Sequence, residues 1–526
     1  MSEIPPAAAA ASQKAGARSG DASDRVWQLG LAAVVALYVL IRIPLLGIPA
    51  VRDEGLFGVA AQAILRGETL YRDVFDMKPP GIFYIYALAL KIFPATPVGL
   101  HLFLHLWNFA ALMLVVAIAH ELRGRWAALW SGWIYAAFSA GASIDGHTAC
   151  TEIFLLLPVV ASFWLALRAI RAERRGWRYW LASGGLGAAA CWIKQPAAFL
   201  LLTIPIYLTA FTPAGKRMRA CADYGLWLLG GLLVTACVLL AFRSVWDEFI
   251  YWSFTHSIEY SGLLWDDWKS NLAGRLAAWS REQAFPIIAA IAGIVVGIRR
   301  RERLAWAGLA FFSLSLASTV QSPWFYGHYF ALTAPALALA GGIACGQLTP
   351  TLLARHPALP PVLAGAGLIP LFLAPPNYTF LPPWDAEFQA AAYLREKSAP
   401  DDWIFIYGSE PQILFLAERK CANPYIFLLP LMRNIPRHRE FQHRAWDRIT
   451  AVRPLYLVPS YTSLWQGAAG IDPFFHTQLE KLSSTAYHFE TLLYFDVDRG
   501  KFEFTNSPQN IPDIWRLMEF WRRNEQ

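Results

Sequence analysis

The sequence predicts a polytopic α-helical membrane protein that ends in a soluble α/β domain. Of its 526 residues, 56% are hydrophobic and only 16% are charged, whereas soluble domains carry nearer to about 25% charged residues. Long apolar segments recur along the first two thirds of the chain, and short basic clusters separate them. After about residue 377 the composition changes to that of a soluble domain. These observations indicate membrane spans followed by a separate soluble unit.

We expect about eleven membrane spans, since a helix of about 20 apolar residues crosses a bilayer. Residues 1–25, which are rich in Ala, Ser and Gly, precede the first span and are expected to form a disordered cytoplasmic tail. The apolar segments lie at 26–47, 99–121, 126–143, 150–167, 179–194, 197–211, 223–242, 284–298, 304–320, 329–347 and 360–376.

Basic residues mark alternate loops between these segments. Lys and Arg gather at 123–125, 168–178, 216–219, 299–303 and 355, whereas the loops around Asp145 and Trp324 carry none. The positive-inside rule places the basic loops and the N-terminus in the cytoplasm and the C-terminal domain outside. The net charge of +7 is therefore spread over cytoplasmic loops, which argues against a nucleic-acid-binding patch.

The first external loop, residues 48–98, is expected to hold two helices at the membrane surface. Residues 57–65 follow an amphipathic rhythm that Gly67 ends. Residues 80–93 are apolar but too short to span the bilayer, and the preceding prolines suit a first helical turn. Asp53 and Lys78 lie near the starts of these two helices.

The chain is thus divided into the tail 1–25, a transmembrane catalytic module 26–376 and an extracytoplasmic α/β domain 377–526. The domain shows strand patterns at 403–408 and 454–458, a short helix at 412–418 and a hairpin over 494–504. Residues 244–282 and this domain are expected to shape the substrate pocket. The six cysteines show no C-x-x-C spacing, and neither a disulfide framework nor a metal site is expected.

Several side chains that are suited to chemistry fall on the outer side in this topology. The first loop supplies acids and a lysine, the second loop and the next span two more acids, and later segments a lysine and an aromatic-flanked histidine. They are Asp53, Glu54, Asp76, Lys78, Asp145, Glu152, Lys194, Tyr326 and His328.

Each candidate also has a purely structural alternative. Asp53 and Glu54 suit a helix cap or a first helical turn. Lys78 and Lys194 suit lipid headgroups at the interface, and Tyr326 an aromatic belt. Glu152 is less easily explained in this way, because an acid one turn into an apolar span is costly.

Together these groups suit the transfer of a sugar from a lipid-phosphate carrier. Phosphate is already a competent leaving group, so one carboxylate can deprotonate the acceptor hydroxyl while cations hold the departing phosphate. A single displacement of this kind inverts the anomeric centre, whereas a glycoside hydrolase needs a second carboxylate.

The motifs DEG at 53–55, GETLYRDVFDMKPPG at 67–81 and FYGHYF at 325–330, with the region of Asp145 and Glu152, resemble the GT-C superfamily of membrane glycosyltransferases. The similarity is to bacterial relatives of dolichyl-phosphate-mannose–protein mannosyltransferases and of the aminoarabinose lipid A transferase. It extends over about residues 26–345 and is most specific in the first external loop.

The resemblance implies an inverting enzyme of the bacterial inner membrane, with a polyprenyl-phosphate sugar donor and an acceptor such as lipid A or its core, a glycan, a glycolipid or a protein. It implies a base at Asp53, supported by Glu54 and Asp145, and a donor-phosphate ligand at Lys78, supported by His328 and Lys194. Leu56, Phe57 and Met77 depart from the aminoarabinose branch, which leaves the sugar, the acceptor and a metal requirement open.

Rival functions share part of this pattern. A transporter or flippase of lipid-linked sugars would have similar spans, although repeated halves with interrupted helices are typical of transporters and none is evident. An O-antigen ligase or polymerase would use diphosphate donors, and a non-catalytic scaffold would bind glycans through its outer domain. Loss of product in a folded Asp53→Asn protein distinguishes the enzyme from these alternatives.

Overall fold

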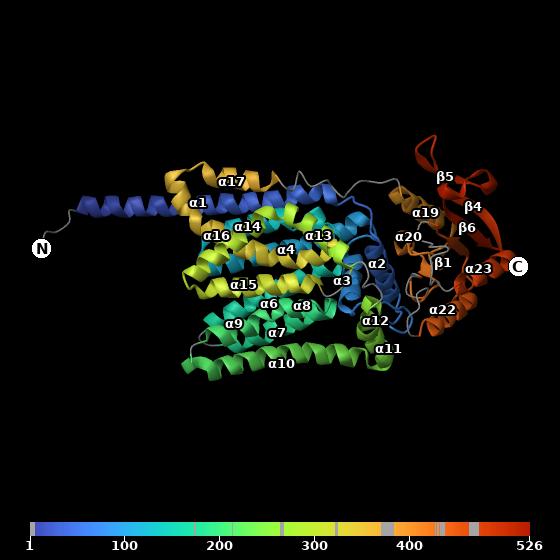
Figure 1. Cartoon of the computed structure of the whole chain (residues 1–526), viewed down its shortest axis with the longest axis horizontal. Coiled ribbons are helices and arrows are strands. Elements are labelled where there is room, and N and C mark those ends of the chain that lie inside the picture. The colour runs from blue at the N-terminus through green and yellow to red at the C-terminus, as the bar shows by residue number, and fades with distance from the viewer. Residues whose placement is uncertain are drawn as a thin grey trace.

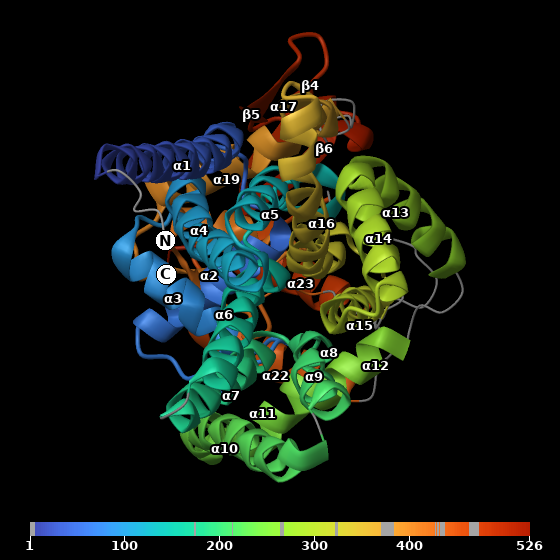
Figure 2. The ribbon, with the colours of Figure 1, turned by 90° about the vertical axis from the view of Figure 1, so that its left-hand side faces the viewer.

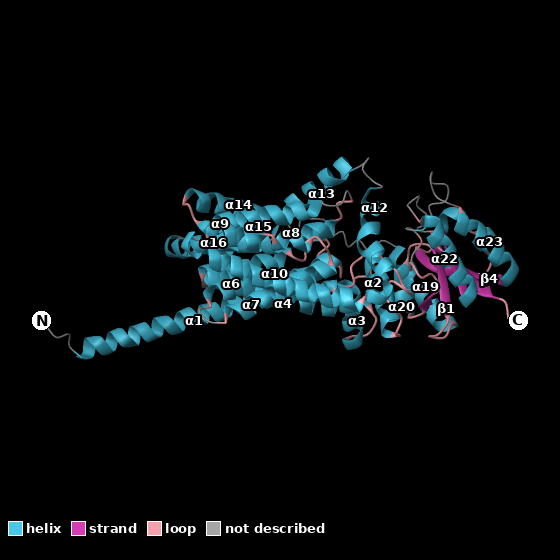
Figure 3. Cartoon of the chain, turned by 90° about the horizontal axis from the view of Figure 1, so that it is seen from below, coloured by secondary structure: helices cyan, strands magenta, loops and turns pink. Residues whose placement is uncertain are grey.

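The computed structural model describes residues 6–172, 175–212, 214–262, 268–320, 324–369, 383–426, 428, 431, 437–461 and 473–525. It is an elongated molecule with a bundle of long helices at one end and a small sheet domain at the other (Figure 1). Strands occur only in the sheet domain within the described residues (Figure 3).

Long apolar helices form the bundle and lie roughly along the long axis (Figures 1 and 2). Among the described residues, six helices are long and apolar enough to cross a membrane, or seven if the bent pair α13–α14 is counted as one span. The chain is therefore a multi-pass membrane protein. The bundle contains α1 (Pro6–Arg42), α4 (Pro97–Arg123), α5 (Arg125–Phe138), α6 (Thr151–Arg171), α7 (Gly176–Ile193), α8 (Ala197–Leu201), α9 (Thr203–Phe211), α10 (Arg217–Ala241), α13 (Trp268–Glu282), α14 (Ala284–Arg299), α15 (Arg303–Ala317), α16 (Ala334–Arg355) and α17 (Leu359–Gly367).

The predicted count of about eleven spans is not confirmed, because α5, α8, α9 and α17 are short. Helix α1 begins at Pro6, in an alanine-rich run with high helix propensity. The disordered tail expected at residues 1–25 stays a prediction.

Residues 48–98, the predicted first external loop, contain the two expected helices, α2 (Arg52–Leu65) and α3 (Gly81–Ile92). Both lie between the bundle and the sheet domain, together with the short helices α11 (Trp246–Ile250) and α12 (His256–Gly262) (Figure 1). One hydrophobic core extends through this layer, from the adjoining end of the bundle into the sheet domain.

The sheet domain confirms the predicted strands, short helix and hairpin. Its six-stranded sheet has the order β2-β1-β3-β6-β4-β5, with β1 parallel to β2 and β3, and β6 antiparallel to β3 and β4. The strands are β1 (Trp403–Tyr407), β2 (Lys420–Cys421), β3 (Tyr456–Pro459), β4 (Tyr487–Asp496), β5 (Lys501–Thr505) and β6 (Arg516–Arg523), and the helices are α19 (Pro383–Lys397), α20 (Pro411–Ala417), α22 (His438–Val452) and α23 (Phe474–Ala486).

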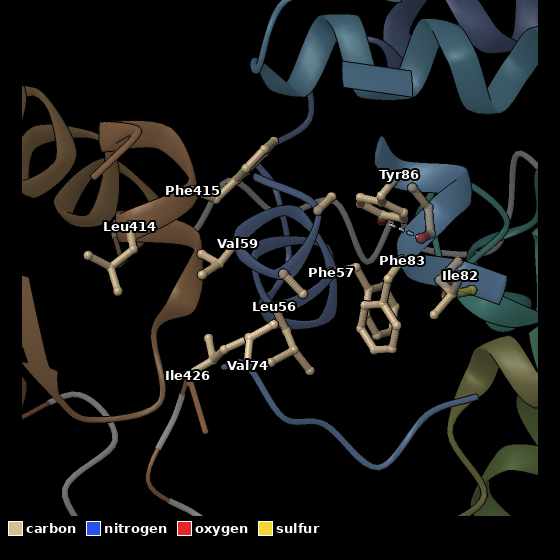
Figure 4. Packing of buried hydrophobic residues seen from close by; sticks show 14 of the residues in the cluster. Leu56, Phe57, Val59, Val74, Ile82, Phe83, Tyr86, Leu414, Phe415 and Ile426 are labelled. Atoms are coloured by element: carbon tan, nitrogen blue, oxygen red, sulfur yellow. Dashed lines mark hydrogen bonds between the residues drawn. The ribbon is translucent and has the colours of Figure 1, made fainter. Parts of the chain in front are cut away.

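Helix α2 is clamped between the bundle and the sheet domain. On one side Phe57 contacts the rings of Phe83 and Tyr86 edge-on, at centroid distances of 5.7 and 5.5 Å. On the other side Val59 faces α20 (Figure 4). At Gly55 a Cβ atom would lie 2.2 Å from the backbone nitrogen of Gln412, so only glycine allows this approach. Helix α2 is therefore closely packed against both layers.

Candidate functional site

The candidate residues lie at the end of the bundle that faces the sheet domain. They lie in five segments: the start of α2, the α2–α3 loop (residues 66–80), the loop between α5 and α6, the end of α7, and the 3₁₀ helix η7 (Gly327–Thr333). Within the described residues, some of these charged groups form ion pairs or hydrogen bonds with other side chains, and others do not.

Glu54 is fully buried, and both of its carboxylate oxygens accept hydrogen bonds. The Val51 backbone N–H donates to its carboxylate at 3.0 Å, and the Ala149 N–H donates to the other oxygen. The His101 ring nitrogen Nε2 lies 3.1 Å from that second oxygen. Burial raises the pKa of Glu54, but the charge of His101 and these hydrogen bonds outweigh burial and hold it below the ordinary value. The helix-cap role thus applies to Glu54, which joins α2, α4 and the second external loop.

We expect Glu54→Gln to lower the free energy of unfolding by about 3 kcal/mol, because it leaves buried partners unpaired. Since folding lowers the pKa of Glu54, this stability is present above the ordinary glutamate pKa and is lost as the pH falls towards the folded-state pKa. Thermal unfolding in detergent between pH 4 and 7 measures both effects. Glu418→Gln, at an exposed position, is the control. If the stability of Glu54→Gln fell with decreasing pH as steeply as that of the wild type, this role would be contradicted.

Asp145 and His328 form the second paired group. Asp145 adopts a left-handed backbone conformation with φ 47°, and its Oδ2 accepts the backbone N–H of His328 at 3.0 Å. The His328 ring nitrogen Nδ1 is 3.4 Å from the same oxygen. Burial raises the pKa of Asp145, yet the bond to His328 and its charge bring it below the ordinary value. This pair ties the second external loop to η7.

Gly327 makes that contact possible. A Cβ atom there would lie 2.6 Å from Asp145 Oδ2 and 2.9 Å from the carbonyl oxygen of Ser143. Both distances are too short for a carbon, so any side chain would separate η7 from the second loop.

We therefore expect Gly327→Ala to reduce the activity at least about tenfold, since small misplacements at a site are costly to the rate. Gly308→Ala is the matched control in α15, because a Cβ there would meet only Ile294 at 3.8 Å. Turnover of the two purified variants checks this, and equal activities would contradict the role of Gly327.

Glu152 and Lys194 form the third pair. The Lys194 ammonium bonds the fully buried Glu152 carboxylate, and the Thr151 hydroxyl donates to the other oxygen at 2.6 Å. Lys194 also lies over the Tyr329 ring, 4.5 Å from its centroid. The positive charge of Lys194 is thus already neutralised by a protein acid. The pair fastens the end of α7 to the start of α6.

Asp53 and Lys78 differ from these pairs. Within the described residues, the half-buried carboxylate of Asp53 and the half-buried ammonium of Lys78 have no hydrogen bond or ion pair. The Lys78 Nζ lies 5.8 Å from the centroid of Phe57, which is one turn beyond Asp53 on α2. The N-cap of α2 is Val51, so Asp53 does not cap the helix. A carboxylate and an ammonium group, neither with an ionic partner among the described residues, therefore lie near the start of α2.

Asp76 shapes the loop that carries Lys78. It is buried, and its carboxylate accepts the backbone N–H of Lys78 at 3.2 Å. Burial raises the pKa of Asp76 above its ordinary value, Lys78 opposes this, and the negative charge of Asp53 adds to it. Asp53, Asp76 and Lys78 are thus electrostatic neighbours.

Tyr326 belongs to a stack of three aromatic rings. Its ring stacks on Trp324 at 5.7 Å and on His328 at 5.4 Å between centroids. Tyr326 is 37% exposed, so this stack reaches the surface beside Asp145.

Three residues of this site were missed from the sequence. His101 pairs with Glu54, Glu282 accepts the backbone N–H of Ser143, and the Gln283 side chain donates to the carbonyl of Phe138 at 3.1 Å. Glu282 and Gln283 lie at the 84° bend between α13 and α14. A histidine in an otherwise apolar span is a signal that could have identified His101. Of the described residues, no group of three or more His, Cys, Asp or Glu side chains is arranged to hold a metal ion.

Comparison with known proteins agrees with this architecture. The family model described as dolichyl-phosphate-mannose-protein mannosyltransferase matches residues 77–242. The crystal structure of ArnT from Cupriavidus metallidurans bound to undecaprenyl phosphate superimposes with a TM-score of 0.60 at 12% identity, covering 93% of this chain and 97% of that one. The chain has the GT-C fold. The resemblance to the GT-C superfamily inferred from the sequence is thereby confirmed.

Two further structures share the GT-C fold. The oligosaccharyltransferase of Archaeoglobus fulgidus gives a TM-score of 0.55 at 13% identity, over 93% of this chain and 76% of that chain. The arabinofuranosyltransferase AftD from Mycobacteria gives 0.54 at 12% identity, over 95% of this chain and 40% of that chain. No curated protein sequence matches the chain.

Proposed function

We propose that the protein is an inverting glycosyltransferase that moves a sugar from a polyprenyl-phosphate donor to an envelope acceptor. The observation that carries this proposal is that, within the described residues, Asp53 and Lys78 beside the start of α2 have no hydrogen bond or ion pair, whereas Glu54, Asp145 and Glu152 are each paired with a cation. Two of the three GT-C structures above are named as transferases, and ArnT was crystallised with undecaprenyl phosphate.

In the proposed reaction Lys78 binds the donor phosphate and stabilises its charge as it leaves. Asp53 accepts the proton of the acceptor hydroxyl as its oxygen attacks the anomeric carbon. The new glycosidic bond forms as the sugar–phosphate bond breaks, so the configuration inverts and polyprenyl phosphate is released. No general acid is needed, because phosphate is already a competent leaving group.

The paired groups act as positioning residues in this proposal. Glu54 with His101, Asp145 with His328, and Glu152 with Lys194 fix the surrounding loops at the mouth of the bundle. This revises the roles inferred from the resemblance, in which Glu54 and Asp145 were catalytic and His328 and Lys194 bound phosphate. A buried ion pair is costly to separate, so its cation is poorly suited to bind a second anion.

We also propose that the site faces the outer side of the bacterial inner membrane, with the N-terminus in the cytoplasm, as the loop charges indicate. Mass analysis of envelope glycans from a deletion strain tests the function. The proposal predicts loss of one sugar, restored by the wild-type gene and not by Asp53→Asn. Unchanged glycans in the deletion strain would contradict it.

A further inference from the structure

The sheet domain holds the segment that carries Lys78, although the two are far apart in the sequence. Phe75 lies three residues before Lys78 and is buried. Its backbone N–H donates to the carbonyl of Pro424 at 2.8 Å. Its ring stacks on Tyr425 with centroids 5.0 Å apart. The aromatic side chain of Phe75 therefore anchors the α2–α3 loop to the sheet domain.

Two arginines of α22 extend this contact. The guanidinium of Arg444 lies over the Phe75 ring, 5.7 Å from its centroid. Arg448 donates to the carbonyl of Asp73 and lies 3.5 Å from Glu68. The loop is thus bonded to the sheet domain at Glu68, Asp73 and Phe75.

The segment 246–262 holds the same loop from the other side. The Ser257 hydroxyl donates to the carbonyl of Met77 at 2.9 Å, and Trp252 contacts Phe75 at 5.8 Å between ring centroids. Arg444 also bonds Glu248 at 2.8 Å, which links this segment to the sheet domain. The loop is therefore enclosed on both sides.

Lys78 itself contributes little to its own placement. Its carbonyl accepts the Tyr71 hydroxyl at 2.6 Å, but its ammonium has no hydrogen bond or ion pair among the residues that the structure describes. The position of the charge is therefore set by the backbone on which it stands, and that backbone is fixed by Phe75 and its neighbours.

We infer that the sheet domain is a positioning element of the donor site, with Phe75 and Arg448 as positioning residues for Lys78. This inference rests on the proposed function, because it assigns the domain to donor binding rather than to acceptor recognition. A long, flexible lysine binds a phosphate well only where its backbone is fixed, since ordering it on binding reduces the affinity.

The test measures binding of undecaprenyl phosphate to the full-length protein in detergent, together with the steady-state constants for donor and acceptor. We expect Phe75→Leu and Arg448→Gln to raise the Kd of undecaprenyl phosphate and the donor KM about tenfold, with kcat and the acceptor KM within about twofold of wild type. Arg448→Lys, which keeps a charge and a donor, should recover part of the loss. Arg499→Gln is the matched control, because this exposed arginine of the same domain pairs with Glu503 at 2.9 Å.

Amide hydrogen exchange supplies a readout that needs no substrate. Peptides covering residues 68–78 should exchange faster in Phe75→Leu and Arg448→Gln, while the melting temperature is retained. A raised acceptor KM with unchanged undecaprenyl phosphate binding would overturn the inference, as would unchanged binding and exchange. Wild-type protein that binds no undecaprenyl phosphate would contradict the proposed function as well, whereas binding that the variants leave unaltered would contradict this inference alone.

Discussion

Asp53→Asn is expected to reduce kcat about 10³-fold while the protein remains folded and binds its donor. The amide cannot accept the proton of the acceptor hydroxyl, and loss of a general base costs typically about 10²–10⁴ in rate. Because the Asp53 carboxylate has no hydrogen bond or ion pair in the described residues, its replacement should leave the melting temperature unchanged. Turnover and thermal unfolding of the purified variant check both parts.

The neighbouring Arg52→Gln is the control for Asp53, since Arg52 is exposed on the same turn of α2. It should keep wild-type kcat. Near-normal turnover in Asp53→Asn would contradict the assignment of the base, and a large drop in melting temperature would show that Asp53 is structural instead.

Lys78→Gln is expected to raise the donor KM about 100-fold, with a smaller fall in kcat. The substitution removes a cation that has no ion pair among the described residues, and charge-assisted bonds to phosphate are among the stronger ones in proteins. A factor of 100 corresponds to about 2.8 kcal/mol of lost binding free energy. Donor titrations with purified protein measure it.

Lys91→Gln provides the comparison for Lys78, because Lys91 is an exposed lysine in the last turn of α3. It should change the donor KM less than twofold. Equal effects of the two substitutions would indicate a general electrostatic effect and contradict the phosphate-binding role of Lys78.

The fold was predictable where local patterns determine it. The amphipathic rhythm of 57–65 and the short apolar segment 80–93 correspond to α2 and α3, and the strand patterns of the C-terminal region correspond to β1 and β3. Hydropathy and turn residues act over a few positions, so such elements are visible in one sequence. The number of spans was less predictable, because short helices such as α5 and α17 are apolar without being long.

The site was predictable as a set of residues but not as a set of partners. Asp145 pairs with His328 and Glu152 with Lys194 across long stretches of chain, and only the packing of α6, α7 and η7 brings these groups together. For that reason residue types alone made Lys194, His328 and Lys78 equivalent candidates for binding the donor phosphate. The ion pairs of Lys194 and His328 distinguish these two residues from Lys78.

The same limit applies to the sheet domain. Its composition indicated a soluble unit, and the domain was expected to help shape the substrate pocket. The bonds from Arg448 to Asp73 and from the Phe75 amide to Pro424 depend on tertiary packing that no local pattern encodes. They connect the domain to one specific part of the first external loop.

The anomeric configuration of the transferred sugar tests the central claim most directly. Purified protein would be given a polyprenyl-phosphate sugar of known configuration and an envelope acceptor extract, and the product linkage would be determined by NMR. Transfer in a single displacement predicts a linkage of inverted configuration, released polyprenyl phosphate in equal amount, and product formation about 10³-fold slower with Asp53→Asn. Retention of configuration, or transfer that requires a diphosphate donor, would contradict this account.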